Sequence, residues 1–120
     1  MGGLISFYAI YNYPEIFSKS ACFSSGFYFD DGDILQKIKN DLQPLQNSLI
    51  YLDCGGKDLD YDFLPSNRLV HEILEKDKKI NVFYKEFPND PHNEVAWYKR
   101  LDVPFKFLFP KRWQLRAKQQ

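Results

Sequence analysis

Apolar residues gather along this chain in two kinds of segment, short continuous runs and longer stretches with helical spacing. Three of the segments are short runs bounded by turn-forming residues, and such runs are typical of parallel strands that are covered on both faces. We expect these strands at residues 19–24, 48–54 and 80–87.

Helical stretches alternate with the predicted strands. The first is apolar on all sides, which is typical of a helix covered from several directions, and Pro14 ends it. The next two carry apolar residues on one face, with Asp33 as the expected N-cap of one and Ser66 or the loop before it capping the other. The helices are expected at residues 4–13, 33–43, 65–76 and, with a bend at Pro104, 93–109.

The alternation of strands and helices predicts an α/β fold. Strands joined through helices run parallel, so we expect about three parallel strands with helices on both faces. The chain has 120 residues and a mass of 14.3 kDa, which is room for a single domain. Residues 110–120 hold four basic side chains and no acidic one, and we interpret them as a basic tail.

Charge and cysteine content exclude several classes of function. Sixteen basic and sixteen acidic residues cancel, which argues against a nucleic-acid partner or an anionic membrane surface. The longest apolar stretches reach only about ten residues, half of what a membrane span needs. Two cysteines, Cys22 and Cys54, are too few for a disulfide framework. A signal peptide carries basic residues before its apolar run, and this chain has none before its first apolar run. These features predict a cytoplasmic protein.

The loops after the second and third strands carry the candidate chemistry, because functional groups in parallel sheets gather at the carboxyl ends of strands. Asp58 follows the second strand and His92 follows the third, and together they could form an acid–base pair. Asp60 and Asp62 are alternative acids. The three aspartates resemble the start of a calcium loop, but Phe63 stands where that loop needs glycine, so we predict no metal site and no cofactor.

Three parts of the chain, in order, resemble the esterase branch of the α/β-hydrolases, which includes feruloyl, carbohydrate and enterochelin esterases. The first part comprises Met1-Gly2-Gly3-Leu4-Ile5-Ser6, Tyr13-Pro14-Glu15-Ile16-Phe17 and Phe23-Ser24-Ser25-Gly26. The second is Gly55-Gly56-Lys57-Asp58, and the third is His92-Asn93-Glu94-Val95-Ala96-Trp97. The resemblance covers residues 1–109 and implies the C-terminal part of an α/β-hydrolase domain. It implies Asp58 as the triad acid and His92 as the triad base, acting on a small-molecule ester.

The first segment departs from the family in one important respect. The family's G-x-S-x-G-G elbow would place Met1 directly after the nucleophilic serine, so that serine would precede this chain. The resemblance then makes the backbone at Met1 part of the oxyanion hole. We therefore expect an esterase fragment that is inactive alone and is complemented by an N-terminal half.

Other candidates favour structural roles. Cys54 is expected to be a buried strand end and not a replacement nucleophile. Ser24 and Ser25 lack the flanking glycines of a nucleophile elbow, so we expect them to line the site. His71 is expected on a helix surface, and Trp97 is expected to pack the closing helix.

An alternative hypothesis needs no catalysis. A three-stranded α/β module has exposed sheet edges, through which it could bind a protein partner or self-associate.

Overall fold

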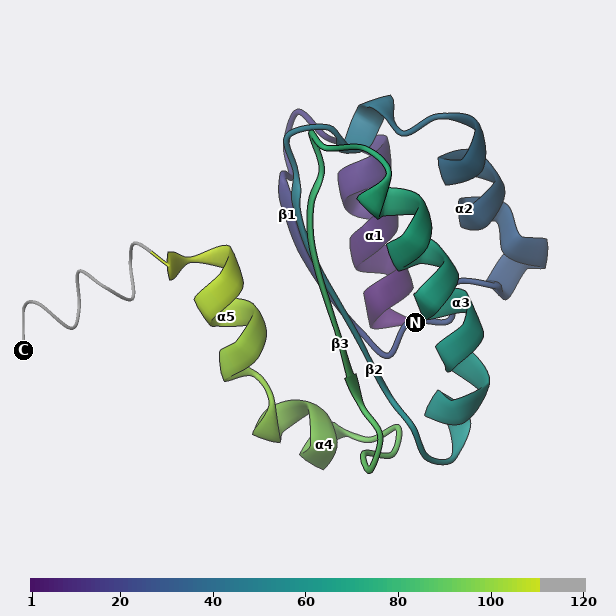
Figure 1. The fold of residues 1–120 in the computed structure, drawn as a ribbon, viewed down its shortest axis with the longest axis vertical. Helices are drawn as coiled ribbons and strands as arrows, with labels where there is room; N and C mark the ends of the chain where they lie inside the picture. Colours follow the sequence, from purple (N-terminus) through teal and green to yellow (C-terminus); the bar gives the residue numbers. More distant parts are fainter. Residues whose placement is uncertain (111–120) are drawn as a thin grey trace, which may run out of the picture.

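A three-stranded parallel sheet forms the centre of the computed structural model, which describes residues 1–110 (Figure 1). The strands lie in the order β1 (Lys19–Phe23), β2 (Leu49–Gly55) and β3 (Asn81–Phe87). Both neighbouring pairs are parallel, with Ser20 opposite Ile50. This confirms the predicted α/β fold with three parallel strands. Apart from residue 110, the predicted basic tail lies outside the described residues.

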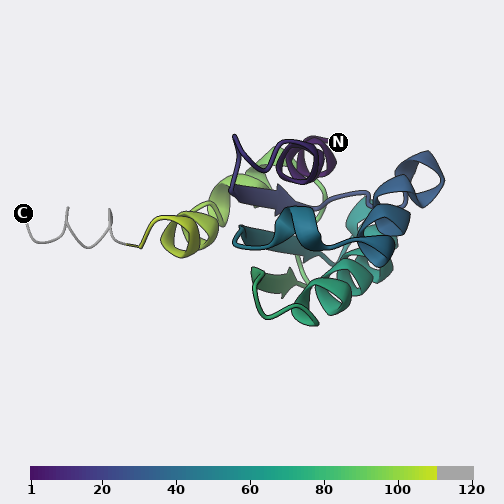
Figure 2. The same ribbon diagram turned by 90° about the horizontal axis from the view of Figure 1, so that it is seen from above.

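Helices lie on both sides of the sheet, as predicted (Figures 1 and 2). One side carries α1 (Gly2–Asn12), α2 (Phe29–Asn40) and α3 (Leu59–Glu75). The opposite side carries α4 (Glu94–Lys99) and α5 (Asp102–Leu108). A short 3-10 turn, η1 (Gln43–Leu45), precedes β2.

The main core lies between the sheet and the helices α1 to α3. Alternate side chains of β1 and β2 face this side, as the period of two in a strand requires. Cys22, Ile50 and Leu52 are apolar, and the one polar member, the buried Ser20, has its Oγ 3.2 Å from Cys22 Sγ. Each large side chain buried there stabilises the fold by about 1.5–3 kcal/mol. The core residues that meet at the centre are Phe7, Ile10, Cys22, Ile50, Leu52, Val70 and Leu74.

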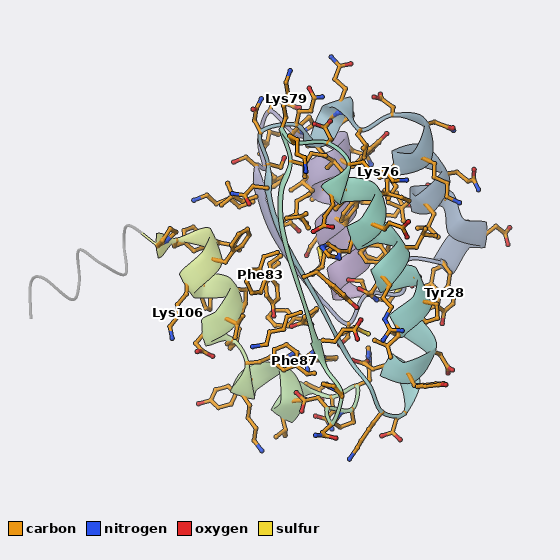
Figure 3. The ribbon with its side chains drawn as sticks, in the orientation of Figure 1. Tyr28, Lys76, Lys79, Phe83, Phe87 and Lys106 are labelled. Atoms are coloured by element: carbon orange, nitrogen blue, oxygen red, sulfur yellow. The ribbon has the colours of Figure 1, made fainter. Side chains whose placement is uncertain are left out.

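A row of aromatic rings crosses the other face of the sheet. Phe23, Tyr51 and Phe83 come from successive strands, with ring centroids 5.8 Å apart at each step. Phe107 of α5 continues the row 5.5 Å from Phe83. Figure 3 shows Phe83 on the side of the sheet where α5 lies. The contact between the rings of Phe107 and Phe83 therefore attaches α5 to the sheet.

One expected cap and one expected helix start were wrong. The range of α2 includes a kink of three residues at positive φ, Asp30, Asp31 and Gly32, so its regular part begins at Asp33, as predicted. Asp33 does not cap this helix, because its carboxylate accepts a hydrogen bond from Tyr8 Oη at 2.6 Å. The next helix, α3, begins at Leu59, so Ser66 lies inside it.

An interior proline costs a helix about 3 kcal/mol, and for this reason the sequence favours Pro65 at the start of α3. The residues before it offset this cost. Phe63 and Leu64 are buried in the first two turns of α3, and each contributes about 1.5–3 kcal/mol. The helix therefore extends through Pro65 toward the carboxyl end of β2.

Candidate active site

Polar side chains from all three strand ends converge at the carboxyl edge of the sheet, where the sequence predicted them. Ser24 directly follows β1, Asp60 lies in the first turn of α3 after β2, and His92 lies in the loop after β3. This edge brings together residues that are far apart in the chain, because the ends of parallel strands lie side by side.

Two glycines allow the loops after β2 and β3 to touch. The backbone N–H groups of Gly56 and Lys57 both donate to the Asp90 carbonyl, at 3.1 and 3.2 Å. A side chain on Gly55 would collide with Asp90, and one on Gly56 would collide with Pro88. The absence of a Cβ at both positions therefore brings the loop that carries His92 against the start of α3.

Asp60 is fully buried, and its carboxylate is bonded on both oxygens. Oδ1 lies 2.6 Å from His92 Nδ1, and Oδ2 accepts from the Gly55 N–H at 2.6 Å and from the Ser24 hydroxyl at 2.5 Å. Three donors offset the cost of removing the carboxylate from water. The arrangement holds an imidazole in one orientation and in one tautomer.

The structure does not bring Asp58 to His92, although the sequence favoured this pair. Asp58 occupies the N-cap position of α3, is exposed, and has φ 56°. Asp62 is also exposed. Asp60 lies next to His92 instead, because it is the first residue of α3 whose side chain is buried.

His92 forms part of the wall of an open cavity of about 290 Å³. The imidazole is held between Phe63 and Trp97, each in an edge-to-face arrangement, with centroids 5.4 and 4.9 Å away. Met1, the predicted oxyanion residue, lies on the same cavity. The full lining is Met1, Gly2, Gly3, Ser6, Ala21, Phe23, Ser24, His92 and Trp97.

A buried ion pair lies directly beneath this site. Arg100 Nε and Nη2 each donate to one oxygen of the Asp53 carboxylate at 2.9 Å, and Nη1 donates to Asp90 at 3.0 Å. Burial raises the pKa of Asp53, while the bonds from Arg100 and Tyr51 act in the opposite direction. The Arg100 side chain is only 3% exposed, so this pair is shielded from solvent screening.

The cysteine and the serines take structural positions. Cys54 is buried, and burial raises the pKa of its thiol to about 12, so it is a neutral thiol at neutral pH and a poor nucleophile. Ser24 lines the site, as expected, and donates to Asp60. Ser25 is buried, is not among the lining residues of this cavity, and its hydroxyl has no partner within residues 1–110.

The two remaining candidates lie in different places. His71 lies on α3, pairs with Glu75 at 2.9 Å, and stacks on Tyr84, away from the cavity. Trp97 does more than pack its helix, since it lines the cavity and its Nε1 donates to Ser24 Oγ at 3.2 Å.

Sequence reasoning missed Arg100 and gave too little weight to Asp60. The periodicity of α3 contains a usable signal for Asp60, which precedes Phe63 and Leu64 by three and four positions and therefore shares their buried face. No local pattern marks Arg100, because both of its carboxylate partners come from other elements.

Comparisons with known protein families, curated proteins and solved structures found no match to this chain. Among the described residues, no helix has the length and apolar character required to cross a membrane.

Proposed function

We propose that this chain supplies the general base and its orienting acid to a serine-type carboxylic ester hydrolase, as in the α/β-hydrolase esterases that it resembles. The observation that carries the proposal is the buried Asp60 bonded to His92 Nδ1 at the wall of an open cavity. No described residue hydrogen-bonds His92 Nε2, so this nitrogen is available to take a proton from a hydroxyl.

The resemblance places the nucleophilic serine directly before Met1. A residue attached there would lie near the cavity, because Met1, Gly2 and Gly3 line it. The serine oxygen bonds to the ester carbonyl carbon while His92 Nε2 takes the hydroxyl proton, and the imidazolium then gives this proton to the departing alkoxide. Water activated by His92 releases the acid, and the backbone at Met1 holds the oxyanion.

The serines within this chain that line the cavity do not replace that nucleophile. Ser6 Oγ donates to the Gly2 carbonyl at 2.8 Å, and Ser24 Oγ donates to Asp60 at 2.5 Å. Neither hydroxyl is bonded to His92. We therefore expect the chain alone to show no His92-dependent hydrolysis of aryl acetates, because losing a triad nucleophile costs about 10⁶-fold in kcat.

The test adds a short N-terminal extension that ends in serine directly before Met1, with an alanine-ending twin as control. A fluorophosphonate probe should phosphonylate that serine, with loss of fluoride, and intact-mass analysis detects the adduct. His92→Ala in the serine-ending chain should abolish labelling. Labelling that survives His92→Ala, or no labelling of a folded serine-ending chain, would contradict the assignment.

A second candidate function, binding through a sheet edge, rests on the open side of β1. Among residues 1–110 this strand pairs only with β2. The N–H groups of Leu49 and Ser24 bond across that pair to Ser18 and Asp53, so the alternation turns the N–H groups of Lys19, Ala21 and Phe23 outward. A strand from a partner or from a second copy of this chain could add there.

Ala21→Pro tests the second candidate, because it removes an outward N–H and leaves the bonds to β2 in place. If this edge mediates self-association, sedimentation of the chain will show a dimer that the variant lacks. A monomer at all concentrations excludes the self-associating form.

We also propose that the protein works in a reducing compartment such as the cytoplasm. Both cysteines are free and buried, which supports that location.

A further inference from the structure

The hydroxyl group of Ser24 lies at the meeting point of three side chains from other elements. Its Oγ is 2.5 Å from Asp60 Oδ2, 3.0 Å from Arg100 Nη2 and 3.2 Å from Trp97 Nε1. Ser24 itself is only 1% exposed, so water does not compete for these bonds.

The chemistry of these partners decides the direction of each bond. A guanidinium and an indole N–H can only donate, so Arg100 and Trp97 occupy the acceptor positions of Ser24 Oγ. The single hydroxyl proton is then left for Asp60, which can only accept while it is ionised. Ser24 is therefore a donor of fixed direction, polarised by the positive charge of Arg100.

Arg100 is held in place independently of this contact. Two of its nitrogens bond to the Asp53 carboxylate at 2.9 Å, and a third bonds to Asp90 at 3.0 Å. The Ser24 N–H also bonds to the Asp53 carbonyl at 2.9 Å. The serine is thus fixed through both its backbone and its side chain.

We propose that Ser24, aligned by Arg100 and Trp97, is the positioning residue of this site. Its hydroxyl and the Gly55 N–H hold Asp60 Oδ2, which leaves Oδ1 facing His92 Nδ1. The carboxylate held in this way keeps the imidazole in the Nδ1–H tautomer and presents Nε2 to the cavity. This inference rests on the proposed function only for its catalytic meaning, since the tautomer exists without turnover.

The test measures the His92 tautomer by nitrogen-15 NMR of the full chain labelled at histidine, with His71→Gln to assign the two imidazoles. Ser24→Gly is the decisive variant, because Ser24 has φ 46°, which glycine adopts without strain. Removing the hydroxyl frees Asp60 to rotate. We expect the ratio of the Nδ1–H to the Nε2–H tautomer to fall about tenfold, the effect of losing one hydrogen bond to a charged group.

Ser25→Ala is the matched control. It removes a buried hydroxyl one residue away that bonds to no described group, and it should leave the ratio unchanged. Trp97→Phe removes one donor to Ser24 and keeps an aromatic ring beside His92, so it should lower the ratio even if Ser24→Gly does not fold.

Two outcomes separate this inference from the proposed function. A wild-type ratio in folded Ser24→Gly or in Trp97→Phe overturns the positioning role, whatever the fluorophosphonate result. A shifted ratio in these variants supports it, even if the serine-ending chain is not labelled and the hydrolase proposal fails.

Discussion

His92 Nδ1 and Asp60 Oδ1 lie 2.6 Å apart, although the two residues are 32 positions apart in the chain. They come from the loop after β3 and the first turn of α3, and the carboxylate involved is fully buried. Because Asp58 is exposed only two positions earlier, the two aspartates form a natural pair for comparison.

Asp60→Asn should lower the free energy of unfolding by about 2–4 kcal/mol, because an amide cannot accept all three of the bonds that the carboxylate accepts. Asp58→Asn should change it by less than about 0.5 kcal/mol, as expected for an exposed side chain. Urea unfolding of both variants measures the difference. Equal losses in the two would show that the acid at His92 is misassigned.

Replacing Arg100 by leucine should destabilise the fold by about 3–5 kcal/mol, because Asp53 would remain buried without its partner. The double variant with Asp53→Asn should lose less than the sum of the two single variants, since removing both charges leaves none unpaired. A double-mutant cycle from chemical denaturation gives this coupling. Simple additivity would mean that the ion pair contributes nothing.

Gly3→Ala should destabilise the fold by about 1–3 kcal/mol, because the added methyl would collide with Ser25 Oγ and push α1 away from the loop after β1. Gly2→Ala is the control, since a methyl group added there would have no neighbouring atom within 4 Å. That substitution should be neutral or should stabilise the helix by up to about 1 kcal/mol. Thermal unfolding of the two variants should therefore give melting temperatures shifted in opposite senses or by clearly different amounts.

Acid should weaken a second ion pair, which joins Arg68 of α3 to Glu86 of β3. The bond from Arg68 lowers the pKa of Glu86 from its ordinary value to about 2. A carboxylate whose pKa is lowered by folding stabilises the protein above its unfolded pKa and loses this effect as the pH falls toward the folded value. The stability advantage of the wild type over Glu86→Gln should therefore be constant at neutral pH and shrink between about pH 4.5 and pH 2. Melting temperatures across this range test it, and an advantage that grows in acid would contradict it.

Both cysteines should be unreactive while the protein is folded. Burial raises the pKa of each thiol to about 12, so almost no thiolate exists at neutral pH. Cys22 and Cys54 should react with a disulfide reagent such as DTNB only on unfolding, which absorbance measures with and without denaturant. Rapid labelling of the native chain would show that one of the strands opens readily.

Local patterns were sufficient to predict much of this fold. Continuous apolar runs marked all three strands to within one residue at either end, since a covered strand must be apolar wherever it lies in the protein. The carboxyl edge of the sheet was correctly predicted as the meeting place of the polar loops, because parallel strands have a common direction. The position of His92 at this edge was predicted for the same reason, because His92 lies in the loop after β3.

The sequence by itself determined the alternation of strands and helices and the edge at which polar groups gather, because both depend on the order of residues along the chain. Only the tertiary structure decided which aspartate faces His92 and what holds it. Because Phe63 is buried, α3 begins before Pro65, at Leu59. In this helix Asp60 faces inward, and Asp58 at the N-cap stays in solvent. Arg100 reaches Ser24 only when the sheet and α4 have packed together, since no spacing along the chain encodes a contact between them.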